Sequence, residues 1–544
     1  MRRQKKRRKD QPQRHKDHTT FHKENITRSK TASKEKTEEN KKNNDRWIIF
    51  LLLLFCFDLC ETLCDLCAFV VSLLFASYPT FPELETITMK RIAILTAGGD
   101  TPALNATLAG AVTRANQRKI EVFGIIKGFS GLLNPRVPHV HLNPLFTTIP
   151  ELVPTLGGTL LGASRDYVDS DDKTTINAVI SRLGQLKVDG LICVGGDGTL
   201  NGMQALGESL PTVLAPKTID NDLGLNYQNE ADEWERAERP GKEPVYSRRF
   251  ACETFELDQM MNYVTPGYAT SVFVSASGVE RIRTTAESHR RIAIVEVMGR
   301  HSGYIALGAC YGRPDLLLVP ECPLNVDLLV EKIKQIYELQ KNVVIVCGEG
   351  IVDQSGQELG AELNSTDPAG NKILSGASEA LRSLLVTRLG DDYFTSKRRN
   401  ESASAAIFTR KIGHTQRGGR PIMFDRFYAM QLGGNAVDML AEGQINSVSI
   451  LQWSEKNGFH VAGIPANDFR DRWGLIHARQ MHPSFYDPIR MKPSATGIDY
   501  LKPIFNNAVG PDDCEALQKT FSASNLSSPY HSVNTDINKR IRTL

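Results

Sequence analysis

Short apolar runs recur along the chain from residue 90 onward, and longer amphipathic segments separate them. Segments such as Val326–Gln340 place apolar residues at helical spacing. Continuous apolar strands that alternate with helices are typical of parallel sheets with both faces covered. The pattern therefore predicts a doubly wound α/β architecture with parallel-rich sheets. The apolar runs are Arg91–Thr96, Glu121–Ile126, Val188–Val194, Thr212–Pro216, Arg291–Val297, Leu316–Val319 and Val343–Val346.

Two later segments do not follow this alternation. Residues 226–263 form a charged stretch, which we expect to be a surface insertion. Residues 521–544 are rich in Ser, Asn and Thr, and we expect this polar tail to be loosely ordered. Residues 89–520 then form the main folded region.

The first 88 residues differ from the rest. Residues 1–46 carry 17 Lys and Arg against 7 Asp and Glu, and residues 47–78 are strongly apolar apart from three acidic positions. Three interpretations stay open: a membrane anchor or nucleic-acid-binding arm, a solvated charge run, or a leader outside the native protein. We favour the leader, with translation starting at Met89, because Met89 directly precedes the first apolar run.

Composition sets the class of protein. With 544 residues, 41% of them hydrophobic, the chain is long enough for two or more α/β lobes. The net charge of +3 comes from the basic leader, so the remainder is mildly acidic, and we expect no nucleic-acid partner for it. The cysteines indicate buried thiols in a reducing, cytoplasmic compartment rather than a disulfide framework. They include Cys56, Cys60, Cys64 and Cys67 in the leader, and Cys193 and Cys347 in apolar runs.

Three of the apolar runs are followed by sequences suited to ligand binding, and ligands of doubly wound sheets gather at strand ends. After the first run, Gly98 and Gly99 precede a helix that begins near Asn105. Such glycines let the backbone approach a phosphate, and the helix start offers free N–H donors. A tight strand-to-helix turn would give the same sequence, so this loop alone is a weak signal.

The second loop, residues 195–199, reads GGDGT and again follows a strand. Its glycines leave room for a nucleotide, and Asp197 is suited to hold Mg²⁺, which neutralises charge during phosphoryl transfer. Similar loops occur in other kinase families, so this one indicates a phosphoryl donor more firmly than an acceptor. The sequence contains no G-x-x-x-x-G-K-[ST] motif, which argues against a P-loop.

The third loop places Lys217, Thr218, Asp220 and Asp222 after another apolar run. Two carboxylates at this spacing can divide the work, because one can accept a proton from an attacking hydroxyl while the other positions metal or base. A polar turn is the alternative interpretation. We disfavour it, because a buried strand delivers this cluster to the same edge as the other two loops.

Six motifs, in this order, resemble those of the phosphofructokinase family and span residues 90–445. The resemblance implies two doubly wound lobes with the active site between them, and phosphorylation of fructose 6-phosphate in glycolysis. It also implies a homo-oligomer, because some family residues reach in from a neighbouring subunit. The motifs are AGGDTPALN (97–105), GGTLLGASR (157–165), GGDGT (195–199), PKTIDND (216–222), SHRRIAIVEVMGRHSG (288–303) and IGHTQRGGRPIMFDR (412–426).

The same resemblance implies roles for single residues. Asp220 is implied as the proton acceptor for the sugar 1-hydroxyl, with Asp222 and Arg165 as further catalytic residues and Asp197 as the Mg²⁺ ligand. Taken singly, Arg291 could be a solvated strand end and His414 a structural histidine. Donor binding is implied for Gly99, Arg165, Asp166, Gly196, Asp197, Gly198 and Thr199. Sugar-phosphate binding is implied for Thr218, Ile219, Asp220, Arg291, Met298, Gly299, Arg300, Glu349, His414, Thr415, Gln416 and Arg417.

The sequence departs from the family at one substrate arginine, which is replaced by Phe408, and Arg410 is a candidate substitute. Donor choice depends on two positions. Gly198 leaves space for ATP, where pyrophosphate-dependent relatives usually carry Asp, whereas Lys217 resembles the pyrophosphate enzymes. We expect ATP. A pyrophosphate-dependent phosphotransferase and a catalytically silent regulatory subunit are the alternatives, and no membrane partner is expected if translation starts at Met89.

Overall fold

The computed structural model describes residues 89–544 except 167, 170, 251, 361–375, 397–401, 507, 512–514, 516–517, 520–521 and 523–530. All of the described residues belong to one unit, Thr86–Leu544. The predicted leader and its four cysteines lie outside the described residues.

The first sheet has seven strands in the order β13-β12-β5-β4-β1-β2-β3. The strands from β12 to β2 are parallel, and the edge strands β13 and β3 run antiparallel to their neighbours. The bounds are β1 (Arg91–Thr96), β2 (Glu121–Ile125), β3 (His139–His141), β4 (Gly190–Gly195), β5 (Thr212–Pro216), β12 (Ser447–Ser454) and β13 (Gly458–Pro465).

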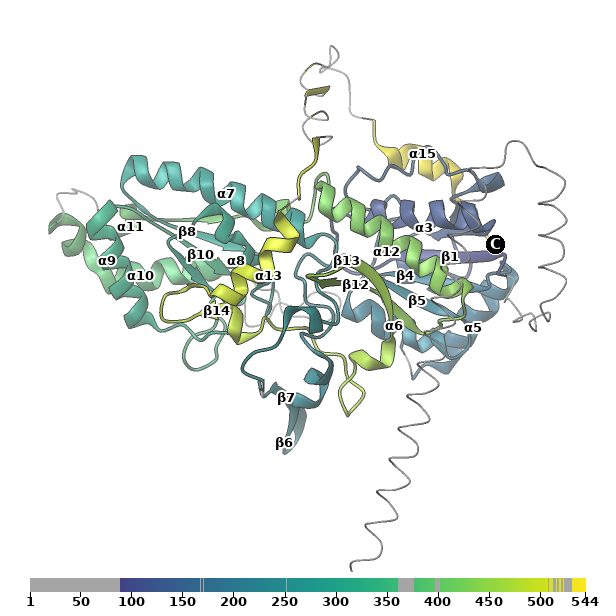
Figure 1. The fold of residues 1–544 in the computed structure, drawn as a ribbon, viewed down its shortest axis with the longest axis horizontal. Coiled ribbons are helices and arrows are strands. Elements are labelled where there is room, and N and C mark those ends of the chain that lie inside the picture. Colours follow the sequence, from purple (N-terminus) through teal and green to yellow (C-terminus); the bar gives the residue numbers. More distant parts are fainter. Residues whose placement is uncertain are drawn as a thin grey trace, which may run out of the picture. The chain divides into compact units, whose positions relative to one another are not determined.

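Helices cover both faces of this sheet (Figure 1). Ile92 and Ile94 of β1 pack in a buried cluster with α3 (Leu104–Arg118) and α12 (Met423–Ala441). Ala93 and Leu95 pack in another cluster with α5 (Lys173–Gln185) and α6 (Asp197–Gly207). Since successive side chains of a strand point to opposite faces, β1 is buried on both sides, which explains its continuous apolar sequence.

The second sheet has four parallel strands in the order β11-β8-β10-β9. They are β8 (Ile292–Val297), β9 (Leu316–Leu318), β10 (Val343–Gly348) and β11 (Ile407–Lys411). Helices α7 (Tyr268–His289) and α8 (Tyr304–Gly308) pack on one face, and α9 (Val326–Gln340) and α10 (Ala377–Ser396) on the other. The predicted α/β class with parallel-rich sheets is confirmed.

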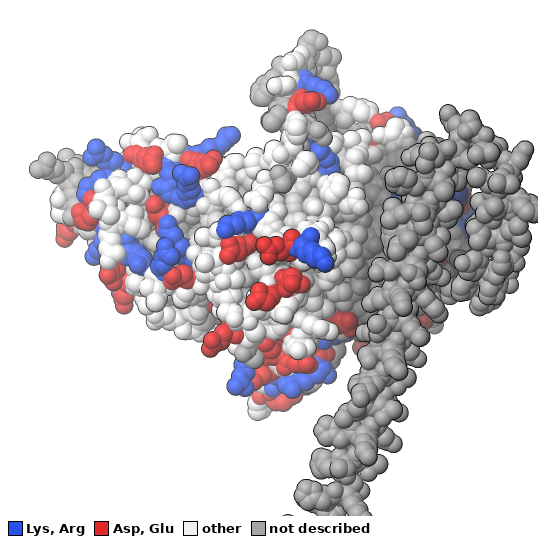
Figure 2. Space-filling model, viewed as in Figure 1, with Lys and Arg blue, Asp and Glu red and all other residues white. Residues whose placement is uncertain are grey.

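The predicted insertion contains η2 (Gln228–Glu233) and a hairpin of β6 (Trp234–Arg239) and β7 (Lys242–Arg248). Figure 2 shows acidic and basic side chains mixed on this hairpin, and β6 is exposed after its first residue. Its base is different, because the buried Arg248 Nη1 lies 2.6 Å from Oε1 of the buried Glu230. The expectation of a surface insertion was therefore wrong for the two ends of the hairpin.

The polar tail includes α15 (Val533–Arg540), whose Ile537 is buried in the same cluster as α3 and α12 on one face of the first sheet. The Arg542 N–H donates to the His139 carbonyl oxygen at 2.8 Å, next to β3. The expectation of a loosely ordered tail was wrong for this part. Cys193 and Cys347 are buried free thiols, as expected. No helix within the described residues is both long enough and apolar enough to cross a membrane.

Candidate active site

The three ligand-binding loops predicted from the sequence meet at the carboxyl edge of the first sheet. Their strands β1, β4 and β5 are neighbours. The Ala97 N–H donates to the Val194 carbonyl oxygen at 2.9 Å, and the Lys217 N–H to that of Gly195 at 2.9 Å. The prediction that the loops share one edge is confirmed.

The Lys217 ammonium lies inside this group of loops. It is 3% exposed and donates a hydrogen bond to the Gly99 carbonyl oxygen. Burial, reinforced by the nearby Arg417, lowers the pKa of Lys217 to about 8, against the opposing carboxylates of Asp100, Asp220 and Asp222. At neutral pH this side chain remains mostly charged and can bind an anion.

Residues 217–222 form a tight turn held by its own side chains. The Thr218 hydroxyl donates to Asp222 Oδ1 at 2.8 Å and accepts the Asp220 N–H at 3.0 Å. Asn221 adopts φ +56°, a left-handed conformation that Asn tolerates better than most residues. The Ser302 hydroxyl, which follows β8, donates to the Asp220 carbonyl oxygen at 3.3 Å and so joins this turn to the second sheet.

The Asp220 carboxylate is buried and only partly satisfied. The residue is 5% exposed, and among the described residues its Oδ1 has no hydrogen-bond partner. Oδ2 lies 3.7 Å from Arg417 Nη2. Burial raises the pKa of Asp220 to about 7; Arg417 and Arg300 oppose the shift, whereas Asp222 and Glu349 add to it. A carboxylate with an available oxygen and a pKa near 7 suits a general base at neutral pH.

The end of β8 brings Met298, Gly299 and Arg300 to the same region. Gly299 has φ +138°, and a Cβ there would lie 2.6 Å from the Ser302 carbonyl oxygen, so only glycine fits. The Arg300 N–H donates to Oε1 of Glu349 at 3.1 Å, and Glu349 directly follows β10. Burial raises the pKa of Glu349, and the hydrogen bond from Arg300 opposes that shift.

Gln416 is fully buried and holds this β8 loop in place. Its Oε1 accepts the Met298 N–H at 3.0 Å, and its Nε2 donates to the hydroxyls of Ser271 at 3.1 Å and Ser275 at 3.0 Å on α7. Both ends of the Gln416 amide are therefore already hydrogen-bonded within the protein. Any role of Gln416 in sugar binding therefore acts through the position of the loop.

Arg417 connects the first glycine loop to the Asp220 turn. A Cβ at Gly99 would lie 2.9 Å from Arg417 Nη1, so the glycine of the first loop makes room for this guanidinium. The same Nη1 donates to the Asp100 carbonyl oxygen at 3.5 Å. Arg417 therefore lies between the first loop and Asp220.

Other predicted site residues are placed differently. Arg291 precedes β8 and Met298 follows it, so the six-residue strand separates them, by about 20 Å at the usual rise per residue. His414 and Thr415 are exposed in η5 (Gly413–Gln416). Ile219 is buried in the cluster that α7 and α8 form with the second sheet, so only its backbone can contact a ligand.

Arg165 and Asp166 are exposed on the loop that pairs with the first one through the bridge between Ala97 and Ser164. Phe408, at the departure from the family, packs against the cluster that α7 and α8 form with the second sheet. The register of β11 on β8 pairs Phe408 with Ala293 and Arg410 with Val295, so Arg410 shares its face and is exposed.

Asp197 is a suitable ligand for Mg²⁺. It begins α6, and its Oδ1 accepts the Gly198 N–H at 2.8 Å. Burial raises the pKa of Asp197, as does the neighbouring Asp222 carboxylate, while Arg300 and Lys217 lower it. Mg²⁺ prefers one or two carboxylates completed by water and phosphate oxygens. The part of the chain that the structure describes has no group of three or more His, Cys, Asp or Glu side chains suited to a metal, so such completion would be needed.

Sequence reasoning missed Thr265, Asn262 and Arg479 as neighbours of the Asp220 turn. The Thr265 hydroxyl donates to the Thr218 carbonyl oxygen at 2.9 Å, and the Arg479 N–H to that of Asp222 at 2.6 Å. These residues lie in segments without a recognisable motif. Nothing in the sequence pattern marks them.

The phosphofructokinase family model matches residues 91–227 and 251–440. Several relatives are 32% identical to this chain, and two of them have different phosphoryl donors in their names. These two are the ATP-dependent 6-phosphofructokinase of Corynebacterium efficiens over 367 residues (66% of this chain and 90% of that protein) and the pyrophosphate–fructose 6-phosphate 1-phosphotransferase of Amycolatopsis methanolica over 370 residues (67% and 91%). Among solved structures, the chain is similar to the pyrophosphate-dependent phosphofructokinase of Marinobacter aquaeolei, with a TM-score of 0.57 and 16% identity over 78% of this chain and 92% of that one. This structural likeness bears on the fold alone.

Proposed function

The chain belongs to the phosphofructokinase family of phosphotransferases, and on that basis we propose that it transfers the γ-phosphoryl group of MgATP to the 1-hydroxyl of fructose 6-phosphate. The product is fructose 1,6-bisphosphate. We place Asp220 as the proton acceptor in this reaction.

The environment of Asp220 carries the proposal. Its buried Oδ1 has no hydrogen-bond partner among the described residues, and Arg417 lies 3.7 Å from its other oxygen. The same arginine touches the first glycine loop, so a hydroxyl at Oδ1 would lie beside the donor loops. Asp220 would take the hydroxyl proton as the sugar oxygen forms its bond to phosphorus and the bond to ADP breaks.

The remaining groups divide between donor and acceptor. We assign Gly99, Gly196, Gly198, Thr199, Arg165 and Asp166 to the donor, and the loops carrying Thr218, Met298–Arg300, Glu349 and Gln416–Arg417 to the sugar phosphate. When bound by Asp197, Mg²⁺ supplies positive charge that offsets the phosphate charge of the donor. Lys217 adds a second cation from the protein at the same edge.

ATP is the proposed donor because Gly198 leaves open space. No atom of the described residues lies within 4 Å of a Cβ built at this residue, and we propose that the α-phosphate of ATP uses this space. Pyrophosphate is the second candidate. The observation that favours it is the buried Lys217, which resembles the corresponding lysine of pyrophosphate-dependent enzymes.

The decisive assay measures fructose 1,6-bisphosphate formed by the purified protein from fructose 6-phosphate, with MgATP and separately with Mg-pyrophosphate. We expect turnover with ATP to exceed turnover with pyrophosphate by about 10²-fold or more. The reverse ratio would assign the pyrophosphate reaction. No product with either donor would overturn the proposed function and favour a silent regulatory subunit.

The pH dependence of kcat/KM for fructose 6-phosphate should be bell-shaped. Below about pH 7 the rate should fall about tenfold per unit, because the base must be deprotonated and the pKa of Asp220 is about 7. Above about pH 8 it should fall again as Lys217, with a pKa of about 8, loses its charge. Lys217→Met should lose the alkaline limb and keep the acid limb. A flat acid limb would remove Asp220 as the titrating base.

We also propose that the sites are shared between subunits of a homo-oligomer. Arg291 lies at the far end of β8 from Met298, so it can reach a site only in a neighbouring copy. Hybrids assembled from Asp220→Asn and Arg291→Met chains should then regain activity, because some of their sites combine both wild-type residues. Hybrids that stay as inactive as the two parents would show that Arg291 does not act across an interface.

A further inference from the structure

The segment Arg479–Met481 lies outside the part of the chain that the family model matches, yet it contacts loops of the candidate site on both sheets. Arg479 is 2% exposed, although arginine has a long, charged side chain. Arginine is seldom buried without a specific arrangement of acceptors. The acceptors here are the backbone carbonyl oxygens of Asn221, in the Asp220 turn, and of Asn262.

The Arg479 guanidinium donates to backbone carbonyl groups around Asp220. Its Nε and Nη2 reach the Asn221 carbonyl oxygen at 3.1 Å and 2.7 Å, and Nη1 donates to that of Asn262. The backbone N–H of Arg479 donates to the Asp222 carbonyl oxygen at 2.6 Å. The carbonyl groups of the two residues that follow Asp220 are therefore both held by one residue.

This turn needs external support because Asn221 is in the left-handed region, at φ +56°. Such a conformation persists only where its surroundings fix it. The Asn221 side chain is also held, since its Nδ2 donates to the Tyr500 hydroxyl at 2.7 Å and its Oδ1 accepts the Thr265 N–H at 2.9 Å. Arg479 supplies the contacts to the backbone, and these other residues supply the contacts to the side chain.

Two residues further on, the segment reaches the loop after β8. The Met481 N–H donates to Glu321 Oε1 at 2.7 Å, and the same oxygen accepts the Gly303 N–H at 2.8 Å. Gly303 follows Ser302, whose hydroxyl contacts the Asp220 backbone. The segment therefore fixes the Asp220 turn relative to the loop that carries Met298–Arg300.

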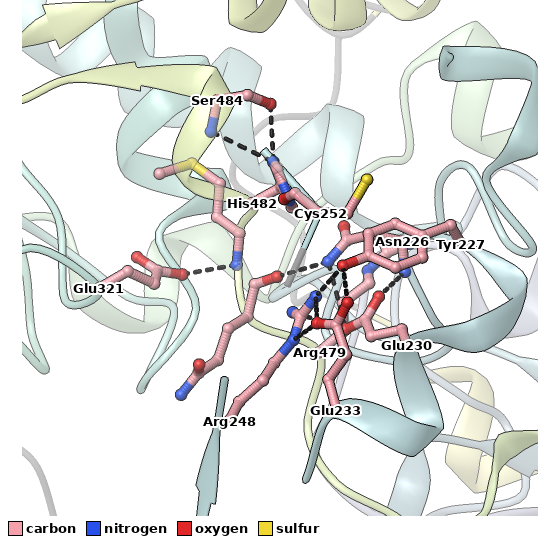
Figure 3. A network of polar contacts seen from close by, with 12 residues as sticks. Asn226, Tyr227, Glu230, Glu233, Arg248, Cys252, Glu321, Arg479, His482 and Ser484 are labelled. Atoms are coloured by element: carbon pink, nitrogen blue, oxygen red, sulfur yellow. Dashed lines mark hydrogen bonds and ion pairs between the residues drawn. The ribbon is translucent and has the colours of Figure 1, made fainter. Parts of the chain in front are cut away.

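On its other side the segment is fixed by the base of the insertion (Figure 3). The Gln480 carbonyl oxygen accepts Asn226 Nδ2 at 3.0 Å, and Asn226 Nδ2 also donates to Glu230 Oε1 at 3.3 Å. Glu230 pairs with the buried Arg248. Figure 3 shows Arg479 close to Asn226, Glu230 and Arg248, with Glu321 apart from this group.

We propose that Arg479 is a positioning residue for the phosphoryl-transfer reaction, which sets the orientation of Asp220 through the carbonyl groups of Asn221 and Asn262. The inference rests on the proposed function, because it assigns Arg479 an effect on the reaction at Asp220. Arg479 contacts backbone carbonyl groups of the turn rather than the Asp220 carboxylate. Its loss should therefore change turnover more than substrate affinity.

The test compares Arg479→Met and Arg479→Lys with the wild type. Arg479→Met should lower kcat by about 10- to 100-fold, the cost of misplacing a catalytic group by a fraction of an ångström to 1 Å, with each KM changed by less than about threefold. Arg479→Lys keeps the charge but cannot supply the planar set of donors. Its kcat should therefore lie between those of the wild type and Arg479→Met. If Arg479→Met does not fold, Arg479→Lys alone decides, by the same split of kcat from KM.

Arg472→Met is the matched control. Arg472 lies seven residues before Arg479 and is exposed. It also donates to a carbonyl oxygen, that of Trp234 at 3.3 Å, but this carbonyl belongs to the insertion hairpin. Its kcat should stay within about twofold of the wild type. An equal loss of kcat in the Arg472 and Arg479 variants, or an unchanged kcat in the folded Arg479 variants, would overturn the proposal.

Amide hydrogen exchange gives a second readout that needs no turnover. In Arg479→Lys, exchange should rise in peptides covering residues 217–223 and 262–265, while the strands of both sheets keep wild-type protection. A uniform rise across the protein would mean a general structural role and would contradict the inference. If the wild type failed to phosphorylate fructose 6-phosphate, the proposed function would fall, and the exchange data would still decide whether Arg479 holds the Asp220 turn.

Discussion

Replacing Asp220 with asparagine is expected to lower kcat by about 10²- to 10⁴-fold, the range for loss of a general base. Asparagine has nearly the same shape, so it can keep the turn between Thr218 and Asp222. Its amide cannot accept a proton from the sugar hydroxyl near neutral pH. The KM for fructose 6-phosphate should change much less, because the loops that hold the sugar phosphate remain. Steady-state kinetics on the purified variant would measure both quantities.

Asp425→Asn is a matched control for this substitution. Asp425 is also buried, and burial raises its pKa to about 6, but its Oδ2 accepts hydrogen bonds from the Thr270 N–H and hydroxyl, both at 2.6 Å. This variant should lose stability on heating and keep its kcat once folded. If Asp220→Asn retained turnover within about tenfold of the wild type, the base would have to be another group.

The sequence predicts the parts of this molecule that depend on local patterns. β1 and β5 are buried on both faces, and both strands have the bounds expected from their apolar runs. Because β1, β4 and β5 are parallel neighbours, their loops had to meet at one edge. The location of Lys217, Asp197 and the first glycine loop follows from that rule alone.

Hydrophobic patterns do not predict edge strands and polar loops in the same way. β11 is an edge strand whose last two residues are exposed, so its sequence, IFTRK, has no continuous apolar run. The β6–β7 hairpin is exposed along most of β6, and its charged sequence looks like a surface loop. In such elements, backbone hydrogen bonds and tertiary neighbours, rather than hydrophobic periodicity, fix the structure.

The sequence pattern also does not predict long-range contacts within the candidate site. Arg479 lies 258 residues from Asn221, whose carbonyl group it holds. Gln416 was assigned to the sugar phosphate by family resemblance, yet the structure shows its amide bonded to Met298 and α7. A motif identifies which residues belong to a site. It does not separate those that touch the ligand from those that hold the ligand-binding loops.

Replacing Gly198 with aspartate is expected to lower kcat/KM for ATP by about 10²-fold or more, while activity with pyrophosphate is kept or increased. The added carboxylate would face the α-phosphate of ATP, and the juxtaposition of like charges costs several kcal/mol, with about 1.4 kcal/mol for each factor of ten. Pyrophosphate ends before that position, so it meets less repulsion. Initial rates with each donor, at matched Mg²⁺ concentrations, would measure the ratio.

The fold should tolerate this change, so a loss of ATP activity can be attributed to charge at the donor site. Gly198 lies in the first turn of α6, where an acidic side chain interacts favourably with the positive end of the helix dipole. A Cβ at this residue meets no atom within 4 Å, so Gly198→Ala tests added volume without charge and should keep most of the ATP activity. Equal losses in the alanine and aspartate variants would mean that the backbone of the loop, and not repulsion of the α-phosphate, limits ATP use. An aspartate variant that still used ATP as well as the wild type would show that donor choice is made elsewhere, with Lys217 as the next position to change.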